Sequence, residues 1–243
     1  MINVQQIRKQ YGAIVAVSHV SFTVPDGLVT GLLGPNGAGK TTTIRAITGL
    51  ARLDAGLVEV DGIDVARQPM RARAQIGVVP ETIGVYDHLT VREHLEYSAK
   101  LQGMNGPARR DRTERLLEQM GLGALASRRA AGLSMGERRR LALARAMVHQ
   151  PHNLVFDEPT NGLDVMSARE VRKEIKRLAA SGCAVLVSSH VMPEVAMLCD
   201  RVIVVAGGQV VAAGTPAELM QQSGCATLED AFVRVIGSEE GLN

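Results

Sequence analysis

Short hydrophobic runs and longer amphipathic stretches alternate along the chain. Runs rich in Val, Ile and Thr between Gly, Pro, Asn or Asp residues predict strands at residues 2–7, 15–24, 28–33, 57–60, 63–65, 75–79, 154–156, 184–188, 201–205 and 209–213. Apolar residues at helical spacing predict helices after residue 41, in two segments between 91 and 120, through 141–147, over 164–181 and 191–198, and in the tail after 215. This alternation indicates an α/β fold with a largely parallel sheet that is covered on both faces.

The pattern is mainly helical in the middle of the chain. We interpret residues from about 82 to 148 as a helical subdomain that is inserted into the α/β core. The core then runs over residues 1–215, and residues 216–243 form a short helical tail that ends in a polar segment. A chain of 243 residues is long enough for one elaborated domain of this kind.

Composition and charge restrict the classes of partner. The net charge of +2 is nearly balanced and aromatic residues make up 2% without any Trp, so we expect no nucleic-acid partner. No apolar run approaches the roughly 18 residues of a membrane span, so any membrane role must come through a partner. The N-terminus lacks the form of a signal peptide. Cys183, Cys199 and Cys225 follow no metal-binding pattern, which is typical of a reducing cytosol.

A glycine-rich stretch joins the predicted strand 28–33 to the helix after it. It fits the pattern G-x-x-x-x-G-K-[ST] in the strand, loop and helix context of a phosphate-binding loop, with residues Gly34, Pro35, Asn36, Gly37, Ala38, Gly39, Lys40, Thr41 and Thr42. The glycines let successive N–H groups point inward at the positive end of the helix. Lys40 adds a charge for the outer phosphates, and the Thr41 hydroxyl can bind Mg²⁺. The alternative is a glycine-rich turn with an exposed lysine.

Two acidic residues follow the apolar strand 154–156. Asp157 fits the carboxylate that organises Mg²⁺ at the end of a neighbouring strand. If strand geometry continues, Glu158 points to the opposite face, where it could meet an attacking water. His190 follows the strand 184–188 and could donate to a phosphate and orient Glu158. The alternative for His190 is a capped or surface histidine.

A second possible anion site precedes the helix through 141–147. The N–H groups of that helix and the Ser134 hydroxyl could bind an anion. A Ser with Glu137 three residues later is also a capping box, and spacing alone leaves both interpretations open. By themselves, the three arginines at 138–140 are typical of a solvated face or an acid-pairing patch.

These stretches, in this order, resemble the ATP-binding subunit of an ABC transporter. Residues 34–41 match the Walker A motif, residues 154–157 match Walker B, and residues 133–137 match the signature sequence. The match to further motifs covers nearly the whole chain, with Glu158 as the catalytic glutamate, residues 161–164 as the D-loop, His190 as the switch histidine, Glu81 at the Q-loop position, and Tyr11 where the family stacks an aromatic residue on adenine. The resemblance implies a P-loop NTPase core with a mainly parallel sheet, an N-terminal antiparallel β subdomain and an inserted α-helical subdomain.

The resemblance also implies the cofactors ATP and Mg²⁺. The metal would be bound by Thr41, Asp157 and Glu81, and catalysis would use Lys40, Glu158 and His190. Two copies would pair head to tail around two ATP molecules. Ser134 and Gly136 of one copy would then close on the γ-phosphate held by Lys40 of the other.

Three residues depart from the family pattern. Met135 and Glu137 replace Gly and Gln in the signature, and Glu81 replaces the usual Gln of the Q-loop. Met135 adds bulk, and the two glutamates add negative charge near phosphate. Similar replacements occur in a branch that resembles sodium- and drug-exporting systems with a separate permease.

The resemblance implies a transport ATPase that is cytoplasmic and peripheral on the cytoplasmic face of the membrane. In the family, a groove beside the Q-loop receives a permease helix, and the matching region here is 82–104. The alternative is a soluble ABC-type ATPase acting on nucleic acid or ribosomes, which usually carries two cassettes, a coiled coil or a basic arm. A P-loop GTPase or kinase would leave residues 133–137 and His190 without a role.

Overall fold

The computed structural model describes residues 1–237. Within them, ten strands form two sheets: β1 (Ile2–Tyr11), β2 (Ile14–Val24), β3 (Val29–Leu33), β4 (Ala55–Val60), β5 (Ile63–Asp64), β6 (Ile76–Val79), β7 (Asn153–Asp157), β8 (Ala184–Ser189), β9 (Arg201–Ala206) and β10 (Gln209–Gly214). The α-helices of this part are α1 (Lys40–Ile47), α2 (Pro69–Arg73), α3 (Val91–Leu101), α4 (Gly106–Gln119), α5 (Met135–Ala146), α6 (Val165–Ala180), α7 (Met192–Leu198), α8 (Pro216–Ser223) and α9 (Leu228–Ile236). Short 3₁₀ turns lie at Gly123–Leu125 and Ala130–Gly132.

The larger sheet has the order β10-β9-β3-β8-β7-β6. Its strands are parallel except for β10, which runs antiparallel to β9. Strand β8 lies between β3 and β7, with Ser189 opposite Leu33 and Ser188 opposite Asp157. The segments that follow β3, β7 and β8 therefore leave the sheet at the same edge, where parallel sheets bind ligands.

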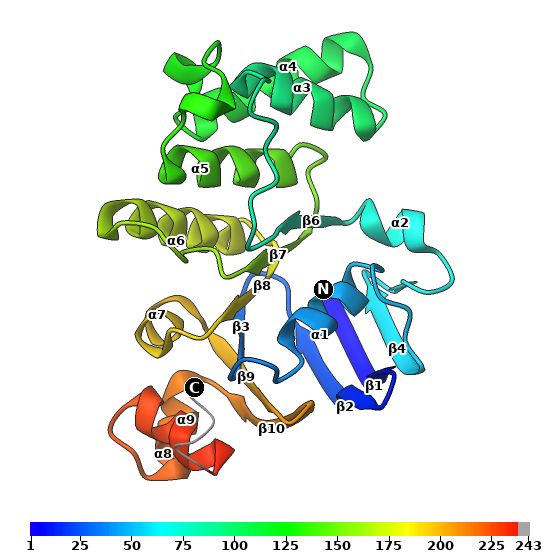
Figure 1. The fold of residues 1–243 in the computed structure, drawn as a ribbon, viewed down its shortest axis with the longest axis vertical. Helices are drawn as coiled ribbons and strands as arrows, with labels where there is room; N and C mark the ends of the chain where they lie inside the picture. Colours follow the sequence, from blue (N-terminus) through cyan, green and yellow to red (C-terminus); the bar gives the residue numbers. More distant parts are fainter. Residues whose placement is uncertain (238–243) are drawn as a thin grey trace.

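The smaller sheet is antiparallel and has the order β2-β1-β4-β5. Helix α1 packs between the two sheets, and Ile44 and Ile47 share a core with Val4 of β1 and Leu32 of β3. Figure 1 shows this arrangement, with α1 beside β1 and β2. The predicted fold class, a mainly parallel sheet with an N-terminal antiparallel part, is confirmed.

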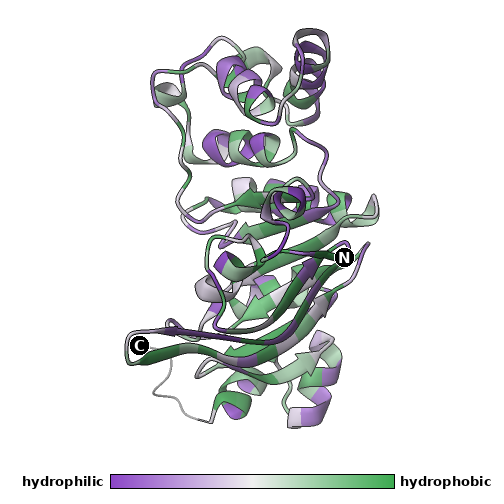
Figure 2. Ribbon diagram, turned by 90° about the vertical axis from the view of Figure 1, so that its right-hand side faces the viewer, coloured by the Kyte–Doolittle hydropathy of each residue, from purple (hydrophilic) through white to green (hydrophobic). Residues whose placement is uncertain are grey.

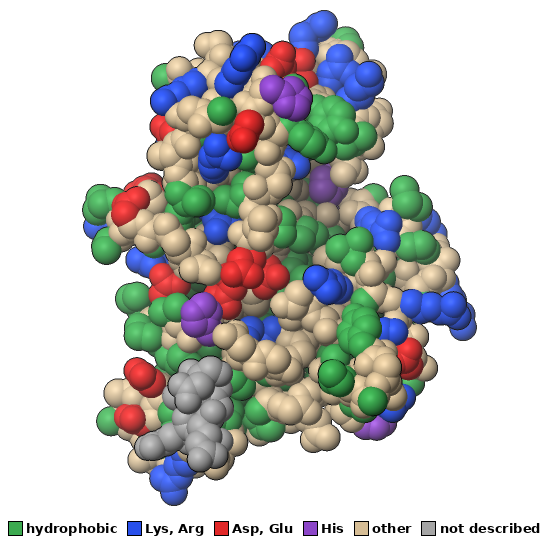
Figure 3. Space-filling model, viewed as in Figure 1, with side chains coloured by type: hydrophobic (Ala, Val, Ile, Leu, Met, Phe, Trp, Pro, Cys, Tyr) green, Lys and Arg blue, Asp and Glu red, His purple; other side chains and the backbone are tan. Residues whose placement is uncertain are grey.

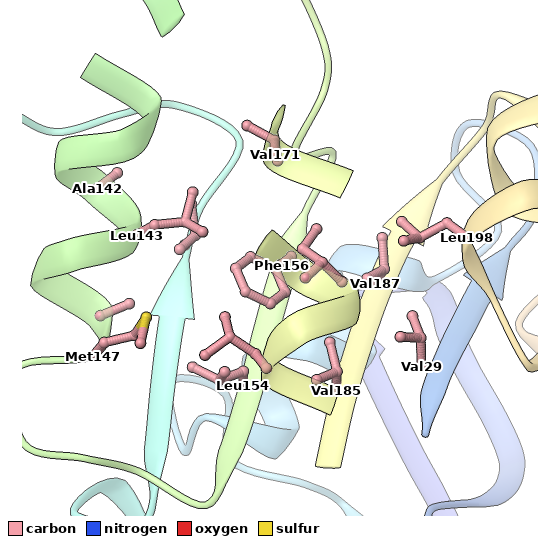
Figure 4. Packing of buried hydrophobic residues seen from close by; sticks show 14 of the residues in the cluster. Val29, Ala142, Leu143, Met147, Leu154, Phe156, Val171, Val185, Val187 and Leu198 are labelled. Atoms are coloured by element: carbon pink, nitrogen blue, oxygen red, sulfur yellow. The ribbon is translucent and has the colours of Figure 1, made fainter. Parts of the chain in front are cut away.

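A second core lies on the other face of the larger sheet. Figure 4 shows Leu154 and Phe156 of β7 between Leu143 of α5 and Val187 of β8. The intervening residues of the same strands, such as Val155, face the first core. Both faces are thus buried, which explains why these strands are continuous hydrophobic runs. Figure 2 shows the hydrophobic strands and the mixed character of the upper helices.

Helices α3 and α4 lie above α5 at one end of the molecule (Figure 1). Thr90 begins α3 with a capping box to Glu93, and Asn105 caps α4. These caps satisfy N–H groups at the helix starts. No helix in residues 1–237 has the length and apolar character that a membrane crossing requires.

Helix α2 and the ends of β1 and β2 differ from the sequence prediction. Helix α2 was not predicted, because five residues are too few to show a helical period. Strands β1 and β2 extend to Tyr11 and from Ile14, since they continue pairing up to the tight turn at Gly12. In the tail, α8 and α9 form the predicted helices, and the predicted polar end at 238–243 lies outside the described residues.

Candidate active site

A cavity of about 500 Å³ lies at the edge where β3, β7 and β8 end. Figure 3 shows acidic side chains, a histidine and a basic side chain gathered near the middle of this face. Most of the residues predicted for the site line the cavity, and Ala16 and Asn161 line it in addition. The full lining is Ala16, Asn36, Gly37, Ala38, Gly39, Lys40, Thr41, Thr42, Glu81, Asp157, Glu158, Asn161 and His190.

The glycine-rich loop curls because its glycines adopt positions that other residues would not tolerate. Gly37 and Gly39 have φ angles of 80° and 100°, in the left-handed region that favours glycine. A Cβ atom on Gly39 would lie 2.5 Å from the carbonyl oxygen of Ala16, and one on Gly34 would lie 2.2 Å from that of Val205. The close packing against β2 and β9 fixes the loop beside the start of α1.

Helix α1 begins at Lys40 without a side-chain cap, because Gly39 precedes it. The N–H groups of its first turn are therefore not capped by a side chain. They lie at the N-terminal end of the helix, which faces the cavity and carries a partial positive charge. Lys40 is buried, and its Nζ atom donates to the carbonyl oxygens of Gly34 at 2.6 Å and Pro35 at 3.0 Å. The loop and helix thus form a site for a polyanion.

Burial lowers the pKa of Lys40, and the negative charges of Glu158, Asp157 and Glu81 oppose this effect. These three acids line the same cavity as the lysine. The cavity therefore holds one lysine against three carboxylates, so a polyphosphate would bind best together with a cation.

Strand β7 ends at Asp157, whose carboxylate accepts a hydrogen bond from the Ser188 hydroxyl. Glu158 has a φ angle of 46°, in the left-handed region. Its N–H group donates to the carbonyl oxygen and the hydroxyl of Ser188, at 3.2 and 3.1 Å. Strand alternation therefore does not extend to Glu158, and both acids line the cavity. A backbone of this kind costs about 1–3 kcal/mol and is often found at functional sites.

His190 follows β8 directly. Its Nδ1 atom lies 2.9 Å from Oε1 of Glu158, and its side chain is 52% exposed whereas that of Glu158 is 12% exposed. The Ser189 hydroxyl accepts a hydrogen bond from the Val191 N–H group, which fixes the turn after His190. The imidazole is thus placed to orient the glutamate.

Glu81 reaches the cavity from the segment after β6. Its Oε1 atom accepts a hydrogen bond of 3.2 Å from the Asn161 side-chain amide. The family resemblance placed Asn161 in the D-loop but did not assign it to the site, since its contact with Glu81 is a tertiary one. Ala16 lines the cavity through β2 and carries no chemical signal in the sequence.

Ser134 and Gly136 do not line this cavity; they lie at the start of α5. The Ser134 hydroxyl accepts from the Glu137 N–H group at 3.3 Å, and the Glu137 carboxylate accepts from the Ser134 N–H group at 2.7 Å. The capping box is therefore present. A Cβ on Gly136 would lie 2.5 Å from the Ser167 hydroxyl, so glycine permits the close approach of α5 and α6.

Tyr11 lies at the end of β1, is 46% exposed and is not among the residues that line the cavity. The Nζ atom of Lys9 lies 5.2 Å from the centre of its ring. Gly34 and Pro35 do not line the cavity either, and their carbonyl groups accept hydrogen bonds from Lys40 within the loop.

The oxygen donors at the cavity suit a hard cation. Thr41 offers a hydroxyl, and Asp157 and Glu81 offer carboxylates. Residues 1–237 contain no group of three or more His, Cys, Asp or Glu side chains that could hold a metal by themselves. Mg²⁺ characteristically binds one or two carboxylates and completes its ligands with phosphate oxygens and water. The donor set fits that mode.

Several known proteins have sequences similar to this chain. The family described as "ABC transporter" matches residues 17–161. The "ABC transporter ATP-binding protein NatA" of Bacillus subtilis (strain 168) is 40% identical over 222 residues, which is 90% of either chain. The "Nod factor export ATP-binding protein I" of Burkholderia orbicola (strain AU 1054) is 40% identical over 229 residues, which cover 94% of this chain and 75% of that protein.

Solved structures agree with these matches. An ATP-binding subunit of an ABC transporter superposes with a TM-score of 0.87 at 30% identity, covering 97% of this chain and 99% of that one. A dimeric cassette bound to ADP and Pi superposes with a TM-score of 0.78 at 25% identity, covering 88% of this chain and 98% of that one.

Proposed function

The chain belongs to the ABC transporter family as an ATP-binding and ATP-hydrolysing subunit, and we propose that its cavity holds ATP together with Mg²⁺. The observation that carries this proposal is the meeting of the Lys40 loop with Asp157, Glu158 and His190 in one cavity. Phosphate chemistry requires these parts: donors for the phosphates, a carboxylate for the metal and a group that orients water.

The loop N–H groups and Lys40 bind the phosphates in this proposal. Lys40 exchanges its contacts with the Gly34 and Pro35 carbonyls for phosphate oxygens. Thr41 and Asp157 hold Mg²⁺, with Glu81 as a further carboxylate, and the bound ion supplies charge neutralisation. Glu158 accepts a proton from the attacking water, and His190 keeps its carboxylate oriented.

A second copy completes the site in the proposed dimer. Ser134 and Gly136 lie outside the cavity of their own chain, at the start of α5, where N–H groups can approach a phosphate. The dimeric cassette with ADP and Pi supports a pairing of this type. The N–H group of Ser134 lowers the pKa of Glu137, with further help from Arg128 and Arg140. The Glu137 charge is thus engaged in the cap and partly balanced.

The membrane partner is a separate permease, and we place its contact in the 82–104 region. A groove of about 520 Å³ lies there between β6, α3 and α5, lined by residues that include Ile83, Gly84, Leu101 and Arg145. The chain would bind from the cytoplasmic face of the membrane. We assign export as the direction, because similar proteins include a Nod factor export ATP-binding protein.

A Glu158→Gln variant tests the site. We expect it to bind ATP, to lose most hydrolysis and to form a dimer with ATP and Mg²⁺, measured by size-exclusion chromatography with light scattering. A Lys40→Ala variant is the control, and it should stay monomeric because it loses phosphate affinity. Rapid hydrolysis by the Glu158→Gln variant would reject Glu158 as the base.

Co-purification tests the partner. A tagged chain expressed with the membrane protein encoded beside it should bring down that protein from detergent extracts. Recovery with ribosomes or nucleic acid in place of a membrane protein would favour the soluble ATPase.

A further inference from the structure

Arg139 is a buried cation within the helix α5. Its side chain is 2% exposed and is the largest among the fully buried side chains of the described residues. Its neighbours Arg138 and Arg140 are both more exposed, so the arginine triplet is not a uniform solvated face. Arginine is almost never buried to this degree without a specific partner.

The Arg139 guanidinium bridges two segments of the cavity wall. It donates to the carbonyl oxygens of Pro80 at 3.3 Å and Glu81 at 3.4 Å, and to that of Asn161 at 3.5 Å. Glu81 and Asn161 line the cavity and are hydrogen-bonded to each other. One side chain of α5 therefore contacts the backbone of both residues.

The hydrogen bonds of Arg139 do not neutralise its charge, because all three acceptors are backbone carbonyls. Its Nε atom is buried and has no partner within the described residues. Burial lowers the pKa of Arg139, and the negative charge of Glu81 acts in the opposite direction. Glu81, whose carbonyl oxygen accepts a hydrogen bond from this guanidinium, is thus also the acid whose charge acts on it.

The negative charge of Glu81 is also in an unfavourable place. It faces a cavity that already contains Asp157 and Glu158, and a third carboxylate beside a polyphosphate is unfavourable unless a cation lies near it. Arg139 supplies a positive charge near Glu81 in addition to the proposed Mg²⁺, and it does so without lining the cavity.

We propose that Arg139 is a positioning residue, whose positive charge balances Glu81 and whose hydrogen bonds hold Glu81 and Asn161 at the nucleotide cavity. The proposal rests on the proposed function, since it assigns the cavity to ATP. It also links α5, which begins at Ser134, to the cavity of the same chain. A shift of α5 would move Glu81 and Asn161 together.

A double-mutant cycle tests the charge balance. The variants are Arg139→Gln, Glu81→Gln and the two combined, and the readouts are kcat and KM for ATP. We expect Arg139→Gln to lower kcat, because Glu81 is left uncompensated, and Glu81→Gln to have its own effect on kcat and KM, because it removes a carboxylate from the cavity. The combined variant should recover kcat to at least about fivefold above the product of the two single effects.

Arg112 provides a matched control. It is an arginine on α4 that also donates to two backbone carbonyls, those of Val148 and Met147, away from the cavity. Arg112→Gln should leave kcat unchanged, and its combination with Glu81→Gln should show only the effect of Glu81→Gln alone. Single effects of Arg139→Gln and Glu81→Gln that simply multiply would overturn the proposal.

If the Arg139→Gln variant does not fold, thermal unfolding of the combined variant provides the test. Recovery of a folded protein in the combined variant then supports the charge balance, and failure to recover it overturns the proposal. If the wild-type protein does not hydrolyse ATP, the proposed function fails, and the same cycle is scored by unfolding temperature alone.

Discussion

The Nδ1 atom of His190 lies 2.9 Å from Oε1 of Glu158, so the ends of the neighbouring strands β8 and β7 are joined by their side chains. Glu158 is held by its backbone as well, through the two hydrogen bonds to Ser188. The imidazole is the more exposed partner. It can therefore be removed with little loss of packing, which separates its effect on chemistry from its effect on folding.

Replacing His190 by alanine should lower kcat for ATP roughly tenfold to a hundredfold, because the proposed base loses its orientation. KM for ATP and the unfolding temperature should change little. Steady-state kinetics and thermal scans check both expectations. A raised KM with unchanged kcat would show that His190 acts in binding alone.

Two substitutions at Ser134 separate its roles in the cap and in the dimer. Ser134→Ala should destabilise the protein by about 1 kcal/mol, because the cap of α5 is lost. Ser134→Asp retains a good cap but places a negative charge where the phosphate of the second copy would lie. We expect the Asp variant to unfold like the wild type and to lose ATP-dependent dimerisation in the Glu158→Gln background. A dimer of normal affinity would contradict the proposed contact.

Gly136→Ala should separate the starts of α5 and α6. The new methyl group would lie 2.5 Å from the Ser167 hydroxyl, and overpacking of this kind costs roughly 1–3 kcal/mol. Chemical denaturation measures the loss. Adding Ser167→Gly removes the obstructing side chain and should restore much of the stability. The absence of any recovery would mean that another contact sets the requirement for glycine.

The Glu137 cap should make stability depend on pH. The pKa of Glu137 is lowered from its ordinary value of 4.5, first by the hydrogen bond from the Ser134 N–H group. A lowered folded-state pKa contributes stability above pH 4.5, and this contribution is lost as pH falls through the folded-state value. Glu137→Gln, which keeps a side-chain acceptor, should therefore be less stable than wild type at pH 7. Unfolding curves of the two proteins should converge as pH falls from 4.5 through the lowered folded-state value, and a constant difference would exclude this origin.

Leu101 offers a test of the permease groove. It lines the groove, and its side chain is 69% exposed. Leu101→Asp should leave the ATPase rate of the isolated chain unchanged while reducing co-purification with the permease. Leu50, also a groove residue and 72% exposed, allows a second substitution on another segment of the chain. Unchanged capture by both variants would move the contact elsewhere.

The phosphate loop and the acidic pair could be predicted from sequence because their signals are local. The loop is one contiguous pattern, and Asp157 directly follows a hydrophobic strand. Parallel strands that end at one edge then bring the two together. The same reasoning placed His190 near Glu158, since β8 lies next to β7.

Features that depend on a single backbone angle or on tertiary contacts could not be predicted. The left-handed φ of Glu158 ended the strand alternation one residue early. Arg139 is indistinguishable from Arg138 and Arg140 in the sequence, and only the packing of α5 against the segments at Glu81 and Asn161 buries it.

Ala16 constrains its neighbours through its main chain. Its carbonyl oxygen would lie 2.5 Å from a Cβ on Gly39 and 3.0 Å from one on Gly208. Every amino acid carries that carbonyl, so exchanging Ala16 for another small residue would not relieve either glycine. Over evolution, other small side chains should therefore be accepted at position 16. Positions 39 and 208 should remain glycine.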